Sequence, residues 1–291
     1  MKLHSASLAA LSLAIALGLS ACGGDKQAAQ QPAADGAAAP AAAGAKVTAE
    51  VSGAGASFIF PLVSKWSADY NTATGAKINY QSIGSGGGIA QIKAATVDFG
   101  ASDKPLDSAE LAEAGLGQFP VVIGGVVPVV NLPGIEPGAI KFTGPLLADI
   151  YLGKITKWND KAIVALNQNA KAQLPDATIT PVYRSDGSGT TANFTNYLKQ
   201  VAGNTWTMND AFKSAATGVV GVGASGNSAV ATTIKSTANS FGYIDLADAN
   251  KNALAIAHLQ NGVKGQFLKP TIANSKKFIE ATSMKSNGEV V

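Results

Sequence analysis

Short runs rich in β-branched and aromatic residues alternate along the chain with segments whose apolar residues recur at helical spacing. The strand-like runs each end in Gly, Ser or Asp, and they cover 46–53, 77–84, 97–102 and 178–185. Helical spacing is found at Leu62, Trp66 and Tyr70, at Ile89 and Ile92, and at Phe194, Tyr197, Leu198 and Val201. This alternation predicts an α/β fold with a mostly parallel sheet, helices on both of its faces, and ligand sites at the carboxyl ends of the strands.

Three of the turns between a predicted strand and a predicted helix combine glycines with a hydroxyl residue. They are GAGASF (53–58), GSGGG (84–88) and DGSGTT (186–191). Glycine lets backbone N–H groups approach a ligand closely, and a helix N-terminus adds unpaired donors and a partial positive charge that suit an oxyanion. The hydroxyl residues are therefore either helix caps or oxyanion donors, and they are Ser57, Ser85, Ser188 and Thr190.

A fourth glycine-rich segment, 218–230, also precedes a predicted helix. It carries no charged residue, so we expect it to have a structural role only.

Two charged residues stand out beside these turns. Arg184 is the sole arginine of the chain, and it lies two residues before Asp186. Asp103 follows a predicted strand, but the next helix already has a capping box that begins at Asp107. Asp103 is therefore not needed as a cap, and it is either a loop residue paired with Lys104 or part of a ligand site.

Several classes of function find no support. No nucleotide P-loop is present, and neither Ser85 nor Ser188 lies in a G-x-S-x-G turn. The two histidines, His4 and His258, are too few and too far apart for a zinc site. The net charge of +3, without a basic stripe, argues against nucleic-acid binding. No cofactor is expected.

The N-terminus resembles an export signal. Residues 1–21 have a basic start and an apolar core too short to span a bilayer. Leu19 to Cys22 resemble a lipoprotein box, in which Cys22 would carry the lipid anchor. Residues 22–46, rich in Ala, Gly, Gln and Pro, predict a flexible tether that holds a domain off the membrane.

Seven stretches, in the same order, resemble the periplasmic phosphate-binding proteins of high-affinity phosphate ABC transporters. They are GAGASFIFPLVSKW, INYQSIGSGGGIAQI, VDFGASDKPL, QFPVVIGGVVPVVNLPG, DIYLGKITKWND, RSDGSGTTANFTNYL and FGYIDLADA. Together they are far more specific than any single glycine turn. The resemblance implies a type II periplasmic binding protein, in which two α/β lobes close over one dehydrated phosphate.

The resemblance also implies the ligand shell, since the family's phosphate-binding positions all match residues of this chain. Asp186 falls on the acidic residue that holds the arginine in place. The implied phosphate-binding residues are Ser57, Phe58 (through its N–H), Ser85, Asp103, Arg184, Ser188, Gly189 and Thr190.

Two of these residues have distinct chemical roles. Arg184 can give an anion two parallel charge-assisted bonds, a geometry that a lysine ammonium does not reproduce. An ionised Asp103 only accepts hydrogen bonds. Phosphate at neutral pH carries a proton for it and sulfate does not, so Asp103 favours phosphate.

The sequence thus predicts a monomeric, lipid-anchored, extracytoplasmic receptor that delivers phosphate to an ABC permease with its ATPase, and not an enzyme. Two alternatives remain open: a phosphatase-like hydrolase that uses Ser85 or Ser188, and a surface phosphate sensor or adhesin on the same fold.

The predicted lobes are residues 47–125 and 126–258, followed by a C-terminal segment, 259–291. Members of the family continue with a further strand and helix that return to the first lobe. Two interpretations stay open: either the sequence is truncated, in which case the first lobe would leave apolar surface exposed, or the first lobe is completed in some other way.

Overall fold

The computed structural model describes residues 49–260, 266–271, 273, 274 and 280. The predicted signal peptide (1–21) and the Cys22 anchor with its tether (22–46) lie outside these residues, as does most of the C-terminal segment (259–291). Within the described part of the chain, no helix combines the length and the apolarity needed to cross a membrane.

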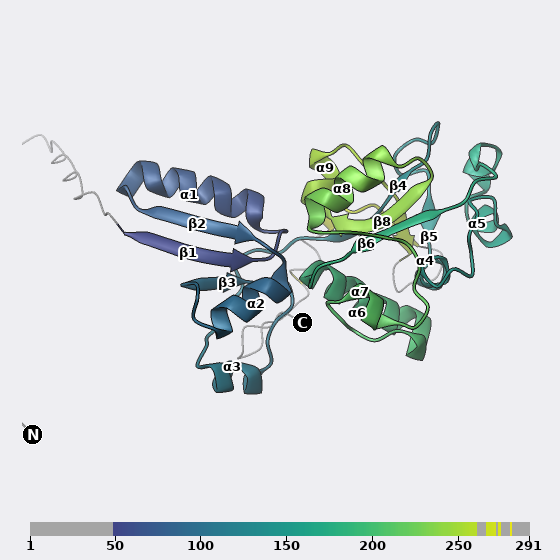
Figure 1. The fold of residues 1–291 in the computed structure, drawn as a ribbon. Helices are drawn as coiled ribbons and strands as arrows, with labels where there is room; N and C mark the ends of the chain where they lie inside the picture. The colour runs from purple at the N-terminus through teal and green to yellow at the C-terminus, as the bar shows by residue number, and fades with distance from the viewer. Residues whose placement is uncertain (1–48, 261–265, 272, 275–279, 281–291) are drawn as a thin grey trace, which may run out of the picture. The chain divides into compact units, whose positions relative to one another are not determined.

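The first sheet follows the predicted strand and helix alternation. Its three strands are all parallel to their neighbours, and their order is β2 (Lys77–Ser82), β1 (Glu50–Gly55) and β3 (Phe99–Ala101). Helix α1 (Phe60–Thr74) lies on one face and α2 (Ser85–Lys93) on the other (Figure 1). Helix α3 (Ser108–Ala114) begins with the predicted Asp107–Glu110 capping box, which is confirmed.

The apolar stripe predicted for α1 does not mark its buried face. Trp66 and Tyr70 are 44% and 51% exposed, whereas Val63 is buried against Ile59 and Ala56. The spacing of these residues correctly predicted a helix. It could not show that the sheet contacts a neighbouring face of that helix, because the sequence carries two apolar faces here.

The second sheet has mixed strand directions. Strand β6 is parallel to β7 and β8, whereas β4 is antiparallel to β8 and β9. The prediction of a mostly parallel sheet therefore holds for the first sheet but not for the β4 side of the second. The order is β7 (Val222–Ala224), β6 (Thr180–Arg184), β8 (Ser240–Asp245), β4 (Val126–Asn131) and β9 (Ala255–Ile256).

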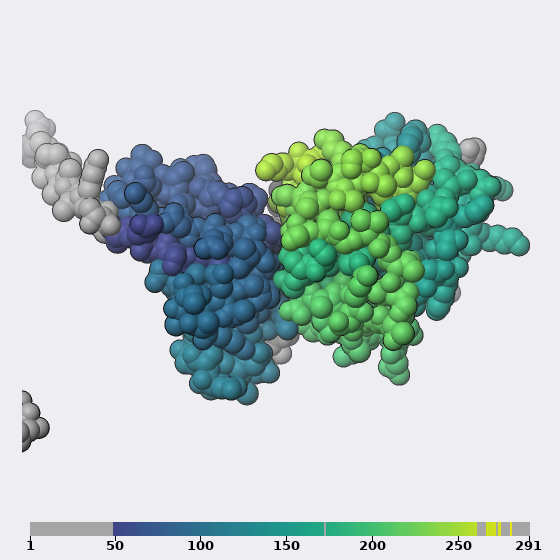
Figure 2. All heavy atoms as spheres, viewed as in Figure 1, coloured from purple at the N-terminus to yellow at the C-terminus, as the bar shows by residue number. Residues whose placement is uncertain are grey.

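Helices cover both faces of the second sheet. Helices α8 and α9 lie on one face and α6 on the other (Figure 1), and in the space-filling view the atoms of this part of the chain, teal to yellow-green, form a continuous surface (Figure 2). The helices of this part are α4 (Gly144–Tyr151), α5 (Lys161–Leu166), η1 (Gln168–Gln173), α6 (Gly189–Ala202), η2 (Gly203–Thr205), α7 (Phe212–Ala215), α8 (Asn227–Ser236) and α9 (Leu246–Lys251). A small third sheet joins β5 (Lys141–Phe142), β10 (His258–Gln260) and β11 (Phe267–Leu268).

A cluster of buried aromatic side chains packs beside strand β6. Tyr151, Phe194, Phe212 and Tyr243 are buried and pack ring against ring, with centroids 4.2–6.1 Å apart. The Tyr151 hydroxyl donates to the carbonyl oxygen of Val182, at 2.8 Å. The end of β6, which carries Arg184, is thus fixed by close packing against buried aromatic rings.

Gly88 allows α2 to approach strand β1. A Cβ at Gly88 would lie 2.5 Å from the Cα of Gly55 and 2.6 Å from the carbonyl oxygen of Ala54. Both obstacles are backbone atoms, so Gly88→Ala must push α2 away from the sheet. We expect it to lower the free energy of unfolding in urea by about 1–3 kcal/mol. Gly117→Ala, where a Cβ meets nothing within 4 Å, is the matched control and should be neutral; equal stability of the two variants would contradict this packing.

Asp245 makes the stability of the fold depend on pH. It is 2% exposed, its Oδ1 caps α9 by accepting from the N–H of Asp248, and its Oδ2 has no hydrogen-bond partner in the part of the chain that the structure describes. Burial, and then the nearby Asp248, raise the pKa of Asp245 from 3.8 to about 7. The folded state therefore binds more protons than the unfolded state between these values, so its stability falls as pH rises through about 4 to 7.

We expect Asp245→Asn to remove this loss, because the amide stays neutral at every pH. Thermal unfolding of both proteins at pH 5 and pH 8 would measure it: the melting temperature of the unaltered protein should fall more than that of the variant. Parallel behaviour of the two proteins would contradict the shifted pKa.

Candidate anion-binding site

Arg184 is the last residue of β6 and is only 2% exposed. Its Nε donates to Oδ1 of Asp186 at 2.7 Å, and its Nη2 donates to Oδ2 of the same carboxylate. Its Nη1 donates to Oδ1 of Asn227 at 3.1 Å. Each Nη nitrogen keeps one further N–H, which has no acceptor among the described residues. The guanidinium is therefore fixed in place and still has two donors to offer an anion.

Asp186 holds the guanidinium as a carboxylate. Its burial acts to raise the pKa, but the hydrogen bonds and charge of Arg184, with the N–H of Gly226 at 3.0 Å, outweigh it. The pKa of Asp186 consequently lies below its ordinary value, and the ion pair persists at neutral pH. The predicted bracing role of Asp186 agrees with these contacts.

The N-terminus of α6 adds backbone donors. Ser188 is the N-cap, and its Oγ accepts from the N–H of Thr191 at 3.1 Å. The N–H groups of Gly189 and Thr190 have no acceptor among the described residues, as expected for the first turn of a helix. A helix of 14 residues adds its partial positive charge at this end. The segment can therefore stabilise negative charge.

The carboxylate of Asp103 lies at this helix N-terminus. Its Oδ1 accepts from the hydroxyl of Ser85 at 2.5 Å and its Oδ2 from the hydroxyl of Thr190 at 3.0 Å. A Cβ at Gly189 would come within 2.0 Å of Oδ1, so only glycine leaves room for this approach. The structure thus connects three predicted residues that are separated by up to 105 positions in the sequence.

These contacts decide between the alternatives that the sequence left open. The capping interpretation is confirmed for Ser188. It is wrong for Ser57 and Ser85, because the caps of α1 and α2 are Ile59 and Gly84, and Thr190 lies inside the first turn of α6.

The alternative ion pair of Asp103 with Lys104 is also wrong. The Lys104 ammonium lies 3.8 Å from the carboxylate of Asp210 instead.

The turn after β1 contributes the remaining residues of the predicted site, Ser57 and Phe58. The Oγ of Ser57 accepts from the backbone N–H of Asn227 at 3.2 Å, which leaves its own proton free to be donated. The N–H of Phe58 has no acceptor among the described residues, and its ring packs with Ile59 and Val63. Site residues therefore follow the carboxyl ends of strands in both sheets.

Sequence reasoning missed two residues that hold the site together. Asn227 begins α8 in the segment that we expected to be structural only. Tyr243 of β8 accepts from the N–H of Arg184 at 3.2 Å and lies 2.7 Å from Oγ1 of Thr191. The sequence does carry a signal for Asn227, because Gly226 and Asn227 stand in a further glycine-rich turn that leads into a helix.

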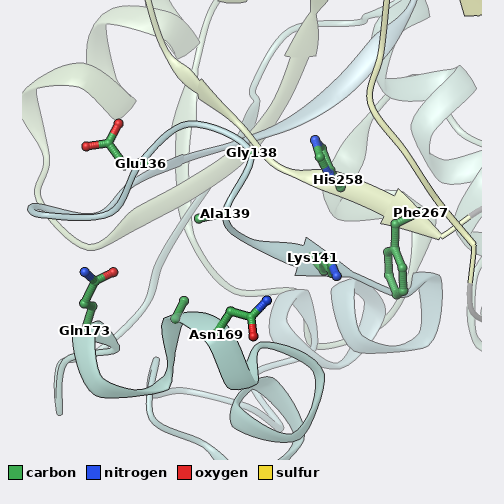
Figure 3. Close-up of a pocket in the computed structure, with 9 residues that line it drawn as sticks. Glu136, Gly138, Ala139, Lys141, Asn169, Gln173, His258 and Phe267 are labelled. Atoms are coloured by element: carbon green, nitrogen blue, oxygen red, sulfur yellow. The ribbon is translucent and has the colours of Figure 1, made fainter.

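A separate cavity of about 640 Å³ contains none of the predicted site residues. Figure 3 shows His258, Lys141 and Phe267 on one side of it and Asn169 on another. Burial, Lys269 and Lys141 lower the pKa of His258. Among the described residues, no hydrogen bond joins His258 to a site hydroxyl, and no cluster of His, Cys, Asp or Glu could hold a metal ion.

The comparisons with known proteins agree with this fold. A structure described as a high affinity periplasmic phosphate-binding protein (PfluDING), bound with phosphate at pH 8.5, aligns with a TM-score of 0.63 and 23% identity, over 81% of this chain and 68% of that one. The fold is that of the type II periplasmic binding proteins.

Sequence relatives identify the family. A family model of the PBP superfamily domain matches residues 40–290. The phosphate-binding protein PstS of Xylella fastidiosa (strain Temecula1 / ATCC 700964) is 53% identical over 273 residues, which are 93% of this chain and 74% of the relative. The protein of the same name from strain 9a5c is 60% identical over 222 residues, which are 76% of this chain and 60% of the relative. The chain belongs to the PBP superfamily and, within it, to the PstS family of phosphate-binding proteins.

Proposed function

We propose that this chain binds inorganic phosphate outside the cytoplasm and delivers it to an ABC permease for uptake. The observation that carries the proposal is the buried Arg184, which Asp186 and Asn227 hold with two N–H groups unused. The names of its relatives, and of the phosphate-bound structure that shares its fold, support the choice of ligand.

The proposed ligand shell consists of the residues that the sequence suggested. Phosphate would take the free N–H groups of Arg184, Phe58, Gly189 and Thr190. It would also take the hydroxyl bonds that Ser85 and Thr190 now give to Asp103, while Asp103 would accept the ligand's proton. The hydroxyls of Ser57 and Ser188 would complete the shell, since each accepts an N–H bond and keeps its own proton.

Isothermal titration calorimetry of the full chain with phosphate and with sulfate tests this function. We expect micromolar or tighter binding of phosphate, which needs about 8 kcal/mol, and much weaker binding of sulfate. Equal affinities, or no heat of binding with phosphate, would overturn the proposal.

We further propose that the site binds without turnover. The imidazole that most often activates a serine nucleophile is absent from this site, since His258 lines a different cavity and no hydrogen bond among the described residues joins it to Ser85 or Ser188. A chromogenic phosphomonoester assay checks this, and product release that depends on Ser85 or Ser188 would restore the hydrolase alternative. The proposal retains a monomer, lobes at 47–125 and 126–258, and a lipid anchor at Cys22.

A further inference from the structure

Asn227 occupies a central position among the side chains of the candidate site. It is fully buried at the first turn of α8. Its Oδ1 accepts from Nη1 of Arg184 at 3.1 Å, its Nδ2 donates to Oγ1 of Thr190 at 3.3 Å, and its backbone N–H donates to Oγ of Ser57 at 3.2 Å. One residue thus contacts three segments that the sequence separates.

The orientation of the Asn227 amide follows from chemistry. A guanidinium only donates, so the atom that faces Nη1 must be the amide oxygen, and the NH₂ group must then face Thr190. Because Thr190 accepts this bond, its own proton is directed to Asp103. The bonds therefore run in one direction, from Arg184 through Asn227 and Thr190 to Asp103.

Asn227 also holds the part of Arg184 that Asp186 does not reach. Asp186 takes Nε and Nη2 and leaves Nη1 to the amide of Asn227. Without this contact, the two N–H groups of Nη1 could exchange by rotation about the Cζ–Nη1 bond.

We propose that Asn227 is a positioning residue for ligand binding: it fixes the Nη1 edge of Arg184 and the donor direction of Thr190. The inference rests on the proposed function only for its affinity readout. The NMR measurement of the Arg184 guanidinium needs no ligand. Its signals can be assigned without ambiguity because the chain holds a single arginine.

The first test is NMR of the chain labelled with isotopic arginine, without ligand. All guanidinium signals then come from Arg184. We expect two distinct Hη1 signals in the unaltered chain and one averaged signal in Asn227→Ala. Asn227→Asp should keep the two signals, since a carboxylate oxygen also accepts from Nη1. Aspartate has nearly the same size and shape as asparagine, so Asn227→Asp should fold even if Asn227→Ala does not, and its NMR signals can then still be compared with those of the unaltered chain.

The second test is the calorimetric affinity for inorganic phosphate. We expect Asn227→Ala to weaken binding by about tenfold, the usual effect of losing a hydrogen bond to a charged group. Asn227→Asp should weaken it at least as much, because the carboxylate cannot donate to Thr190 and adds negative charge beside the anion.

Asn131→Ala is the matched control. The Nδ2 of Asn131 donates to the carbonyls of Ile234, Lys235 and Thr237 at the other end of α8. The control should lower stability while leaving the Arg184 signals and the phosphate affinity unchanged.

The outcomes separate the two proposals. If the unaltered chain fails to bind phosphate, the proposed function fails, and the NMR result still decides whether Asn227 holds Arg184. If the unaltered chain binds phosphate and Asn227→Ala binds within twofold of it, or keeps two Hη1 signals, the positioning role is wrong.

Discussion

Arg184→Lys should weaken phosphate binding by about 100-fold or more. The guanidinium makes three side-chain hydrogen bonds, two to Asp186 and one to Asn227, and retains two N–H groups in the same plane. A lysine has three donors on one atom, so it cannot hold both partners and also present a parallel pair to an oxyanion. Losing two charge-assisted bonds, at about 1.5–3 kcal/mol each, gives the expected factor.

Calorimetry with phosphate at pH 7 measures this effect. The control is Lys157→Arg, a charge-conserving exchange in the exposed pair with Asp176, which should leave affinity unchanged. An affinity of Arg184→Lys within threefold of the unaltered chain would show that Arg184 does not contact the ligand.

Asp103→Asn should reduce the preference for phosphate over sulfate by about 100-fold. An ionised Asp103 can only accept, so it favours a ligand that brings a proton and repels one that brings none. The amide of the variant can donate to a sulfate oxygen, so sulfate should bind more tightly and phosphate less tightly. A change of about 1.4 kcal/mol in each direction gives the expected ratio.

The ratio of the two affinities in competition calorimetry at constant pH is the relevant measurement. Asp107→Asn serves as the control, since Asp107 is a nearby carboxylate that caps α3. It should leave both the stability and the ratio nearly unchanged, because asparagine caps a helix about as well as aspartate. A ratio that stays the same in Asp103→Asn would remove Asp103 from the selectivity mechanism.

The sequence predicted those features of the fold that depend on local chemistry. The strand, glycine and helix turns around Ser85 and Ser188 are present because glycine permits the turn and the helix follows directly. The capping box at Asp107 is present because its bonds join residues three positions apart. The identity of the buried face of α1 depends on distant contacts, and the spacing of Trp66 and Tyr70 did not reveal it.

The candidate site shows the same division. Arg184 and Asp186 could be paired from their spacing, since only Ser185 separates them. Asn227 lies in a glycine-rich turn, but Asn227 and Tyr243 are neutral and contact Arg184 only through the fold, so no local pattern pairs them with that residue. A search for charged residues does not find neutral polar side chains that are buried beside a charged group. These side chains nevertheless supply the remaining hydrogen bonds of that group.

The bonds of Asp103 to Ser85 and Thr190 have a consequence for ligand release. In this structure an internal carboxylate engages two hydroxyls that the proposed ligand would use, at the N-terminus of α6. Asp103 thus competes with the proposed ligand for these two hydroxyls, and because it belongs to the same chain its effective concentration at them is high. Binding of phosphate at this site would therefore be an exchange of hydrogen-bond partners. If the proposed ligand shell is correct, Asp103 would bond to the two hydroxyls again when the ligand leaves, so release would not leave buried donors without a partner.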